Sequence, residues 1–337
     1  MKKKVLILSV GGTIASVKTE NGFKPGLTAE SLIEHIPQLE KIANIDARDI
    51  KSIPIIDSSN MQPEYWAAMA RDVFEALPNY EGIVITHGTD TLAYTSSMLS
   101  FMLQGLSKPI IITGAMKSIV EPGTDAKRNL IGSVSFACED NGGIYVVFND
   151  KIMKGCRVCK MKSQKFDAFC SVNCQDVGCI NSDGGVSYNT NTQKMVSPEE
   201  TTLDDKLDPN IFLLKLIPGT HPEVIDKLLE LGYKGIIIES FGCGGVPFIG
   251  RNLLPGIKKL IERGVAVVIA SQVIYDGVNL TRYEVGRRAL DLGVIPTYDM
   301  TKEATVTKLM WVLGHTNDLN EVKKMMLTNY CGELSVS

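Results

Sequence analysis

The chain has 337 residues, enough for about two domains of ~150 residues each. Hydrophobic residues make up 44% of the chain and charged residues 22%, the proportions of a globular protein that can bury a large core. The formal net charge of -3 argues against a nucleic-acid partner and against binding to an anionic membrane.

The N-terminus joins a lysine run to an apolar run, as secretory signal peptides do. Lys2-Lys3-Lys4 precedes the apolar residues 5–10. The apolar run is too short for a signal peptide, and Gly11-Gly12-Thr13 follows it in place of a cleavage site. No apolar run in the chain approaches the ~20 residues that a membrane-spanning helix needs. We therefore predict a cytoplasmic protein whose residues 5–10 form the first strand.

Strands and helices alternate through the first half of the chain. Short apolar runs bounded by turn residues predict buried strands, and apolar residues near helical spacing predict helices. Thr28 is a predicted helix cap, and Pro63 opens a predicted helix. Such alternation is typical of an α/β fold with a doubly wound, mostly parallel sheet. The predicted strands are 5–10, 53–56, 83–85, 110–113 and 144–148, and the predicted helices are 28–35, 63–77, 91–105 and 129–138.

A polar stretch separates this half from the next. Ser, Asn, Thr, Asp and Pro are prominent from Gly184 to Pro209, which predicts a linker between domains. We expect an N-terminal catalytic α/β domain over residues 1–184, a linker over 185–209 and a smaller C-terminal α/β domain over 210–337. Beyond the linker, the predicted strands are 211–217, 235–239 and 265–270, and the predicted helices are 222–231, 253–263, 282–292 and 301–313.

Small hydroxyl and acidic residues follow three of the predicted strands. Thr13, Asp57-Ser58 and Thr89-Asp90 each lie where a strand ends. In open α/β sheets, ligands bind at the carboxyl ends of the strands. Each group alone fits a plain turn or a helix cap, but three together at one edge of a sheet predict a site.

Amide cleavage is a reaction that these groups can support. A threonine hydroxyl is a weak nucleophile that needs a neighbouring base, and a lysine with a lowered pKa can serve as that base. Spacing does not identify the lysine, and Lys160 with its basic neighbours Arg157, Lys162 and Lys165 also fits a solvated basic face. His87 lacks a matching nucleophile pattern, so we predict a structural histidine.

Five of the eight cysteines lie between residues 156 and 179. Cys156 and Cys159 have the C-x-x-C spacing of a zinc site or a redox pair. The other three cysteines fit no zinc pattern, and His35, His221 and His315 have no metal-binding spacing. We predict unlinked thiols and no metal.

Several motifs together resemble the type I L-asparaginases, the cytoplasmic branch of the bacterial and archaeal threonine-nucleophile amidohydrolases. The resemblance covers essentially the whole chain. The strongest match is the segment His87-Gly88-Thr89-Asp90-Thr91. The other matching segments are Gly11-Gly12-Thr13-Ile14-Ala15, Asp57-Ser58-Ser59, Lys160 ahead of Phe166-Asp167-Ala168-Phe169, and 299–305.

The resemblance implies a role for each matching residue. Thr13 would attack the side-chain amide of L-asparagine and form an acyl-enzyme, while Thr89, Lys160 and Asp90 would handle protons, with Lys160 as the base. Aspartate and ammonia would be the products. The substrate would be held by Asp57, Ser58, Ser59, Thr89 and Asp90. The resemblance implies no metal or organic cofactor, and a homodimer or homotetramer.

One position departs from the family pattern. The loop after Thr13 normally carries a lid tyrosine, and this chain has Phe23 there, with no tyrosine between Thr13 and Ser58. We expect a slower or differently assisted enzyme, since a positioned hydroxyl is missing. One alternative is a catalytically inactive amino-acid-binding homologue. Another is the asparaginase-like subunit of a tRNA-dependent amidotransferase, a family with an extra N-terminal domain, whereas this chain begins at its first predicted strand. The sequence leaves the preference for asparagine over glutamine open.

Overall fold

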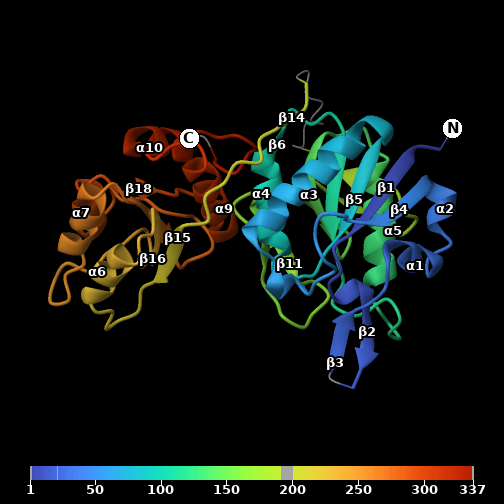
Figure 1. Ribbon diagram of the computed structural model, residues 1–337, viewed down its shortest axis with the longest axis horizontal. Helices are drawn as coiled ribbons and strands as arrows, with labels where there is room; N and C mark the ends of the chain where they lie inside the picture. The colour runs from blue at the N-terminus through green and yellow to red at the C-terminus, as the bar shows by residue number, and fades with distance from the viewer. Residues whose placement is uncertain (1, 21, 191–199, 336–337) are drawn as a thin grey trace. The chain divides into compact units, whose positions relative to one another are not determined.

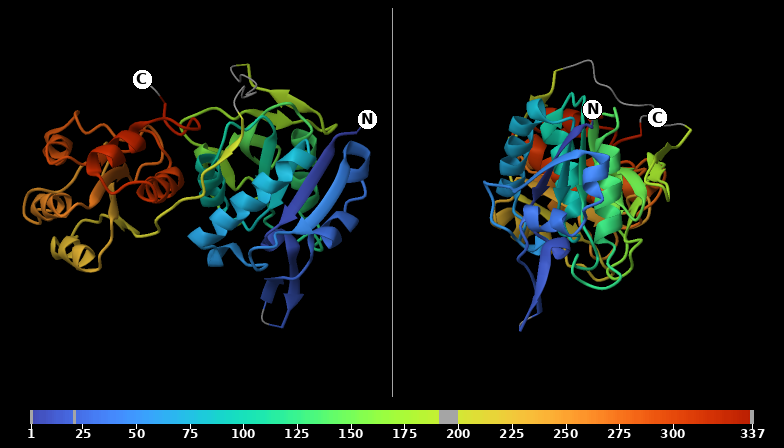
Figure 2. Two further views of the ribbon diagram at one scale, coloured as in Figure 1. Left: turned by 45° about the horizontal axis from the view of Figure 1, so that its top comes forward. Right: turned by 90° about the vertical axis from the view of Figure 1, so that its right-hand side faces the viewer.

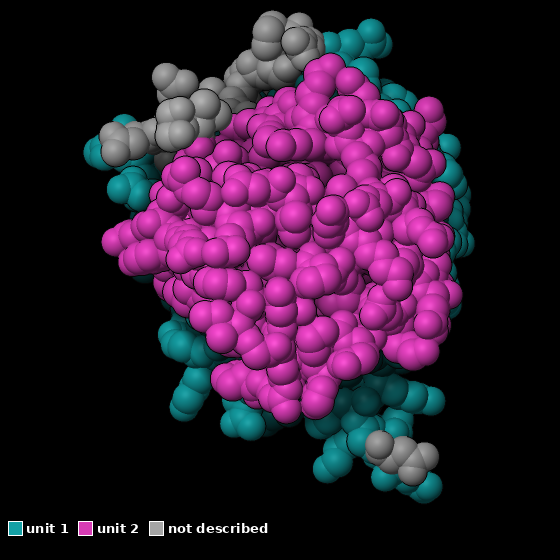
Figure 3. Space-filling view, turned by 90° about the vertical axis from the view of Figure 1, so that its left-hand side faces the viewer, with its two compact units in different colours: residues 1–205 teal, residues 206–337 magenta. Residues whose placement is uncertain are grey.

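A computed structural model describes residues 2–20, 22–190 and 200–335 of the protein. The chain divides into two compact units, residues 1–205 and residues 206–337, which are coloured separately in Figure 3. Each unit has a mainly parallel sheet with helices around it, so the predicted α/β class is confirmed.

The first unit is built on an eight-stranded sheet with the order β13-β12-β9-β8-β7-β5-β1-β4. Five adjacent strands of this sheet, β4, β1, β5, β7 and β8, are parallel to one another. Beyond β8, each of the strands β9, β12 and β13 pairs antiparallel with its neighbour. The bounds are β1 (Lys4–Ser9), β4 (Asn44–Asp49), β5 (Gly82–Thr86), β7 (Pro109–Thr113), β8 (Gly143–Phe148), β9 (Lys151–Lys154), β12 (Gly178–Ile180) and β13 (Val186–Tyr188).

Helices cover both faces of this sheet (Figures 1 and 2), as the doubly wound prediction requires. One face packs its apolar residues against α1, α2 and α5 in a single buried cluster. The other face lies against α4, with α3 beside it. Both faces are buried, which explains why β5 and β7 read as continuous apolar runs. The bounds are α1 (Ala29–Glu34), α2 (Leu39–Ile42), α3 (Pro63–Ala76), α4 (Leu92–Met102) and α5 (Ala126–Ala137).

The strand predicted over 53–56 is wrong. The structure instead has β4 at the edge of the sheet, where polar residues alternate with apolar ones because one side meets water. Pro54 lacks an N–H group and cannot donate to a ladder, and within 53–56 only Ile56 makes a bridge, to Gly11. The apolar run 53–56 is therefore a loop, and not a strand. Its bridge to Gly11 places Asp57 near the end of β1.

Helix boundaries follow the predicted caps in most places. The Thr28 hydroxyl accepts a hydrogen bond from Ser31 N at the start of α1, as the cap prediction requires. The helix expected to reach Gly105 ends earlier, at Met102, and β6 (Leu103–Gln104) follows it.

The predicted linker is more structured than expected. Within 185–209, β13 pairs with β12, and β14 (Thr202–Leu203) pairs with β6. Both strands belong to the first unit, while residues 191–199 lie outside the described residues. The domain boundaries at 184 and 210 stay predictions.

The second unit carries a four-stranded parallel sheet with the order β15-β16-β17-β18. Gly232, Gly264 and Gly293 follow three of its helices, and all three have the positive φ that is typical of a glycine at a helix end. The pattern missed β18 and α10. The bounds are β15 (Ile211–Lys215), β16 (Gly235–Ser240), β17 (Ala266–Ser271), β18 (Ile295–Pro296), α6 (Glu223–Glu230), α7 (Leu254–Glu262), α8 (Glu284–Leu290), α9 (Lys302–Leu313) and α10 (Leu319–Leu327).

Candidate active site

Two glycine-rich segments meet at the carboxyl ends of β1 and β5. Gly12 has φ +78°, and a Cβ built on it would lie 2.3 Å from Gly88 N. Only glycine allows both this backbone conformation and this approach. Thr13 starts a short 3₁₀ helix directly after Gly12, and Thr89 follows Gly88. The packing of the two glycines therefore holds the segments of both predicted threonines against each other.

A third segment joins them through Ser58. Its hydroxyl oxygen accepts a hydrogen bond from Asp90 N at 3.2 Å, and its carbonyl accepts one from Thr91 Oγ1 at 2.7 Å. A Cβ built on Gly88 would lie 2.5 Å from Ser58 Oγ, so this contact also needs a glycine. Ser58 is buried.

Asp57 and Ser59 flank this contact and are both exposed. The Asp57 carboxylate caps the short turn at Ser58, since Oδ1 accepts from Ser59 N at 2.9 Å and from Ser59 Oγ at 2.7 Å. A carboxylate and a hydroxyl thus lie at the solvent side of the segment that packs on Thr89 and Asp90.

Lys160 completes the polar cluster from the antiparallel pair β10 (Val158–Lys160) and β11 (Phe169–Ser171). Its ammonium group donates to Thr89 Oγ1 at 2.8 Å and to Asp90 Oδ1 at 2.6 Å. Thr89 is 6% exposed and the Lys160 side chain 18%, whereas the Asp90 side chain is 61% exposed. Three residues that the motifs singled out therefore form one hydrogen-bonded group, open to solvent on the Asp90 side.

This geometry suits proton transfer. Because Thr89 Oγ1 accepts from Lys160, the Thr89 hydroxyl hydrogen can be donated to a further group. The Asp90 carboxylate stabilises the ammonium form of Lys160 through a charge-assisted bond. An ammonium group at Lys160 can pass a proton outward along this chain, and a neutral amine there can accept one from the Thr89 hydroxyl, as a general base beside a nucleophile must.

The solvated basic face considered for Lys160 is wrong. Arg157 is 2% exposed, and Lys160 points to Thr89 and Asp90. Lys162 does lie at the surface, where it pairs with Asp167.

His87 is a structural residue, as predicted. The ring is fully buried, and burial lowers its pKa from 6.5 to about 4. Gly88 O can only accept a hydrogen bond, so His87 Nδ1 donates to it at 2.7 Å and carries the hydrogen of the neutral ring. His87 Nε2 then accepts from Thr95 Oγ1 at 2.9 Å, and Thr95 Oγ1 accepts from Trp66 Nε1, also at 2.9 Å. The sequence patterns did not predict this buried series of hydrogen bonds, which ends at Gly88, the residue before Thr89.

Phe23 lies on a different kind of element. It belongs to the hairpin of β2 (Ser16–Thr19) and β3 (Gly22–Pro25), where it pairs with Lys18, and its side chain is 50% exposed. Figure 1 shows this hairpin extending away from the rest of the first unit. Asn21, between these two strands in the sequence, lies outside the described residues.

The described residues contain no group of three or more His, Cys, Asp or Glu that could hold a metal ion. All eight cysteines are thiols. Within residues 2–20, 22–190 and 200–335, no helix is long and apolar enough to cross a membrane.

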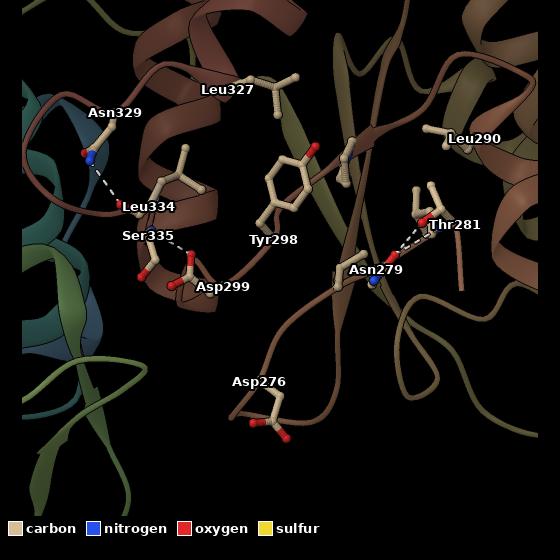
Figure 4. A pocket seen from close by; sticks show the side chains of 13 residues that line it. Asp276, Asn279, Thr281, Leu290, Tyr298, Asp299, Leu327, Asn329, Leu334 and Ser335 are labelled. Carbon is tan, nitrogen blue, oxygen red and sulfur yellow. Dashed lines mark hydrogen bonds between the residues drawn. The ribbon is translucent and has the colours of Figure 1, made fainter. Parts of the chain in front are cut away.

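A separate hollow of about 760 Å³ lies within the second unit, and Figure 4 shows the residues that line it. Tyr298, Asp276 and Asp299 are among its polar residues. The described residues around it include no lysine or arginine, so it offers no side-chain cation to a carboxylate ligand. The Lys160 cluster is therefore the better candidate for catalysis.

Two sequence-family models match the chain. The N-terminal domain of asparaginase matches residues 4–194, and the C-terminal domain of glutaminase/asparaginase matches residues 210–326. The chain is 48% identical over 335 residues to an L-asparaginase of Thermococcus kodakarensis, covering 99% of this chain and 100% of the relative. It is 42% identical over 341 residues to a subunit of the glutamyl-tRNA(Gln) amidotransferase of Pyrococcus furiosus, covering 98% of this chain and 76% of the relative.

Solved structures agree with these relatives. The Thermococcus kodakarensis L-asparaginase structure superposes with a TM-score of 0.91, over 99% of this chain and 100% of that chain. The structure of L-asparaginase I from Vibrio cholerae, 30% identical, superposes with a TM-score of 0.89 over the full length of both chains. The chain belongs to the asparaginase family, as its motifs predicted, and carries both of the family's domains.

Proposed function

We propose that this protein is an amidohydrolase that converts L-asparagine to L-aspartate and ammonia through a threonine acyl-enzyme. The observation that carries the proposal is the contact of Lys160 Nζ with Thr89 Oγ1 at 2.8 Å and with Asp90 Oδ1 at 2.6 Å. The full-length match to a protein named L-asparaginase supports the substrate.

Thr13 is the proposed nucleophile. Its hydroxyl oxygen attacks the side-chain amide carbon of asparagine, and the C–N bond breaks as ammonia leaves. The neutral amine of Lys160 accepts the proton through the Thr89 hydroxyl, becomes an ammonium group that Asp90 stabilises, and returns the proton to the departing nitrogen. Water then cleaves the ester at Thr13 and releases aspartate.

The substrate's α-amino-acid end is proposed to bind between two acidic segments. Asp90 is 61% exposed on its side chain and offers a carboxylate to the α-ammonium group. Asp57, Ser58 and Ser59 contribute further polar groups from the neighbouring segment, and the contact of Ser58 with Asp90 N keeps the two segments in register. Thr89 is assigned a second role, as a hydrogen-bond donor to the oxyanion.

Phe23 is the proposed lid residue. Its exposed ring can cover bound substrate when the hairpin closes, but it has no hydroxyl to hydrogen-bond the nucleophile. The proposed enzyme needs no metal or organic cofactor and acts in the cytoplasm as a homodimer or homotetramer. A minor glutaminase activity is part of the proposal, and the preference for asparagine over glutamine is left to measurement.

An amidotransferase subunit is the second candidate, favoured by the 42% identity to the Pyrococcus protein. That candidate predicts little turnover of free asparagine without a partner and tRNA. An inactive amino-acid-binding homologue predicts binding without turnover.

Ammonia release from free L-asparagine and L-glutamine by the purified protein separates these candidates, with Thr13→Ala as the blank. The proposal predicts turnover of asparagine by the wild type that Thr13→Ala abolishes. Binding of asparagine by the wild type with no ammonia release would reject it.

A further inference from the structure

Two cysteines lie opposite each other in the strand pair that carries Lys160. In the register of β10 and β11, Cys159 pairs with Cys170, and Lys160 pairs with Phe169. Cys159 is 8% exposed, and Cys170 is partly exposed. Directly opposite residues of an antiparallel pair have their side chains on the same face, so the two thiols are neighbours.

The ladder around this pair fixes its geometry. Met161 N donates to Ala168 O at 2.7 Å, and Val172 N donates to Arg157 O at 2.8 Å. Hydrogen-bonded pairs alternate along an antiparallel ladder, so the Cys159 pair, two positions from each, is also of the hydrogen-bonded kind. In such pairs the Cα atoms lie about 5.5 Å apart, within the ~4.4–6.8 Å that a disulfide spans.

The separation of the Cβ atoms, unlike that of the Cα atoms, must shrink for a disulfide to form. Opposite residues in such a ladder have Cβ atoms about 4.5–5.5 Å apart, whereas a disulfide draws them to about 3.5–4.5 Å. A hydrogen-bonded pair lies at the wide end of that range, so bond formation pulls the two strands together by about 1–2 Å next to Lys160.

We propose that Cys159 and Cys170 form a redox-reactive dithiol, which low-molecular-weight disulfides oxidise to a cross-strand disulfide that inactivates the site reversibly. The thiolate of Cys170, the more exposed of the two, attacks a disulfide such as oxidised glutathione, forms a mixed disulfide and releases one thiol. The Cys159 thiolate then attacks the Cys170 sulfur and releases the second thiol. Two protein thiols are oxidised and one small disulfide is reduced.

The effect on activity rests on the function proposed above. Successive residues of a strand point to opposite faces, so Lys160 faces away from the disulfide and responds through the backbone. Its ammonium holds Thr89 at 2.8 Å and Asp90 at 2.6 Å, distances that leave little tolerance. A displacement of about 1 Å in a catalytic constellation can cost up to about 100-fold in rate.

The other cysteines of the cluster provide contrasts. Burial raises the pKa of Cys174, which makes its thiol a poorer nucleophile. Cys179 is exposed on β12, but the residue opposite it on β13 is Ser187. Cys179 can therefore take a mixed disulfide but has no cross-strand thiol partner, and it lies on another strand pair than Lys160.

The test compares the reduced and oxidised wild-type protein with Cys170→Ser and with the matched control Cys179→Ser. Each is treated with oxidised glutathione, its remaining thiols are alkylated, and its peptides are mapped by mass spectrometry. The kcat and KM for asparagine are measured in parallel, before and after reduction with dithiothreitol.

We expect a Cys159–Cys170 cross-linked peptide in the wild type and in Cys179→Ser, with kcat lowered about tenfold or more, little change in KM, and full recovery on reduction. Cys170→Ser should keep its activity in the oxidant.

Three results would overturn the inference: no cross-linked peptide in the oxidised wild type, a cross-link without loss of kcat, or an equal loss in Cys170→Ser. The peptide map of the wild type needs no variant, so a misfolded Cys170→Ser does not prevent the test. If the reduced wild type shows no asparaginase activity, the proposed function fails, while the map still decides whether the dithiol forms the bond.

Discussion

The site framework and the β2–β3 hairpin are opposite kinds of structure within the first unit. The framework consists of the segments around Gly12, Ser58 and Gly88, which touch through backbone atoms and glycines. The hairpin is a two-stranded ribbon whose Phe23 side chain is 50% exposed. Positioning of reacting groups needs tolerances of a fraction of an ångström, whereas covering a substrate needs an element that can move. We therefore assign chemistry to the framework and closure to the hairpin.

The largest effect is expected from removing the amine of Lys160. Lys160→Met should lower kcat by about 1,000-fold, since it removes the proposed base and leaves Asp90 without its charged partner. Lys162→Met is the matched control, because Lys162 pairs with Asp167 at the surface and should matter little. Steady-state ammonia release measures both variants. Equal losses of kcat in the two variants would show that the local positive charge matters, and not the contact of Lys160 with Thr89 and Asp90.

The second effect tests the close contact of the framework glycines. Gly12→Ala puts a methyl group 2.3 Å from Gly88 N, so we expect a loss of about 100-fold in kcat/KM as the two segments separate. Gly232→Ala is the control with the same φ of +78° and nothing within 4 Å, and its cost should be limited to the backbone strain of about 1–2 kcal/mol. Urea unfolding and kinetics on both variants separate strain from displacement. Full activity in Gly12→Ala would contradict the claim that the framework, unlike the hairpin, needs close packing for catalysis.

A smaller effect is expected on the hairpin. Phe23→Tyr adds one hydroxyl and should raise kcat/KM by about tenfold, less than the ~100-fold at the low end of what a positioned acid or base contributes. Phe23→Leu serves as the control for the apolar cover, and both variants are compared by steady-state kinetics. If Phe23→Tyr gains nothing while Lys160→Met is inactive, a missing hydroxyl does not limit this enzyme.

The smallest effect on activity at neutral pH is expected at His87. Its pKa is about 4 in the folded protein and 6.5 in the reference state, so the unfolded chain takes up the proton first as pH falls. Stability from this group is complete above pH 6.5 and declines by about 3 kcal/mol as pH falls to about 4. His87→Asn should keep a donor near Gly88 O and flatten this slope. Urea unfolding at several pH values measures it, and an unchanged slope would contradict the buried neutral ring.

Sequence reasoning reached the fold and the members of the site to different extents. Buried parallel strands such as β5 were predictable because both of their faces are apolar. The edge strand β4 was not, because its solvated side breaks the apolar run, and the 53–56 run was mistaken for it. The motif at Thr89 marked a site, but spacing alone could not select Lys160, which lies 71 residues away and reaches it only through the β10–β11 pair. Family resemblance supplied that assignment.

The buried series of hydrogen bonds from Trp66 through Thr95 to His87 could not be predicted from the sequence. Trp66 and Thr95 come from two different helices, α3 and α4, and both look like ordinary core positions in the sequence. Their polar atoms matter only because the fold brings them to His87.

The most direct test of the central claim is to locate the acyl group during turnover. The protein is mixed with asparagine, quenched in acid within the first turnovers, digested and mapped by mass spectrometry. We predict an aspartyl ester on the peptide that contains Thr13 in the wild type and none in Thr13→Ala. An ester on Thr89, or an ester that persists in Thr13→Ala, would contradict the assignment of the nucleophile to the end of β1.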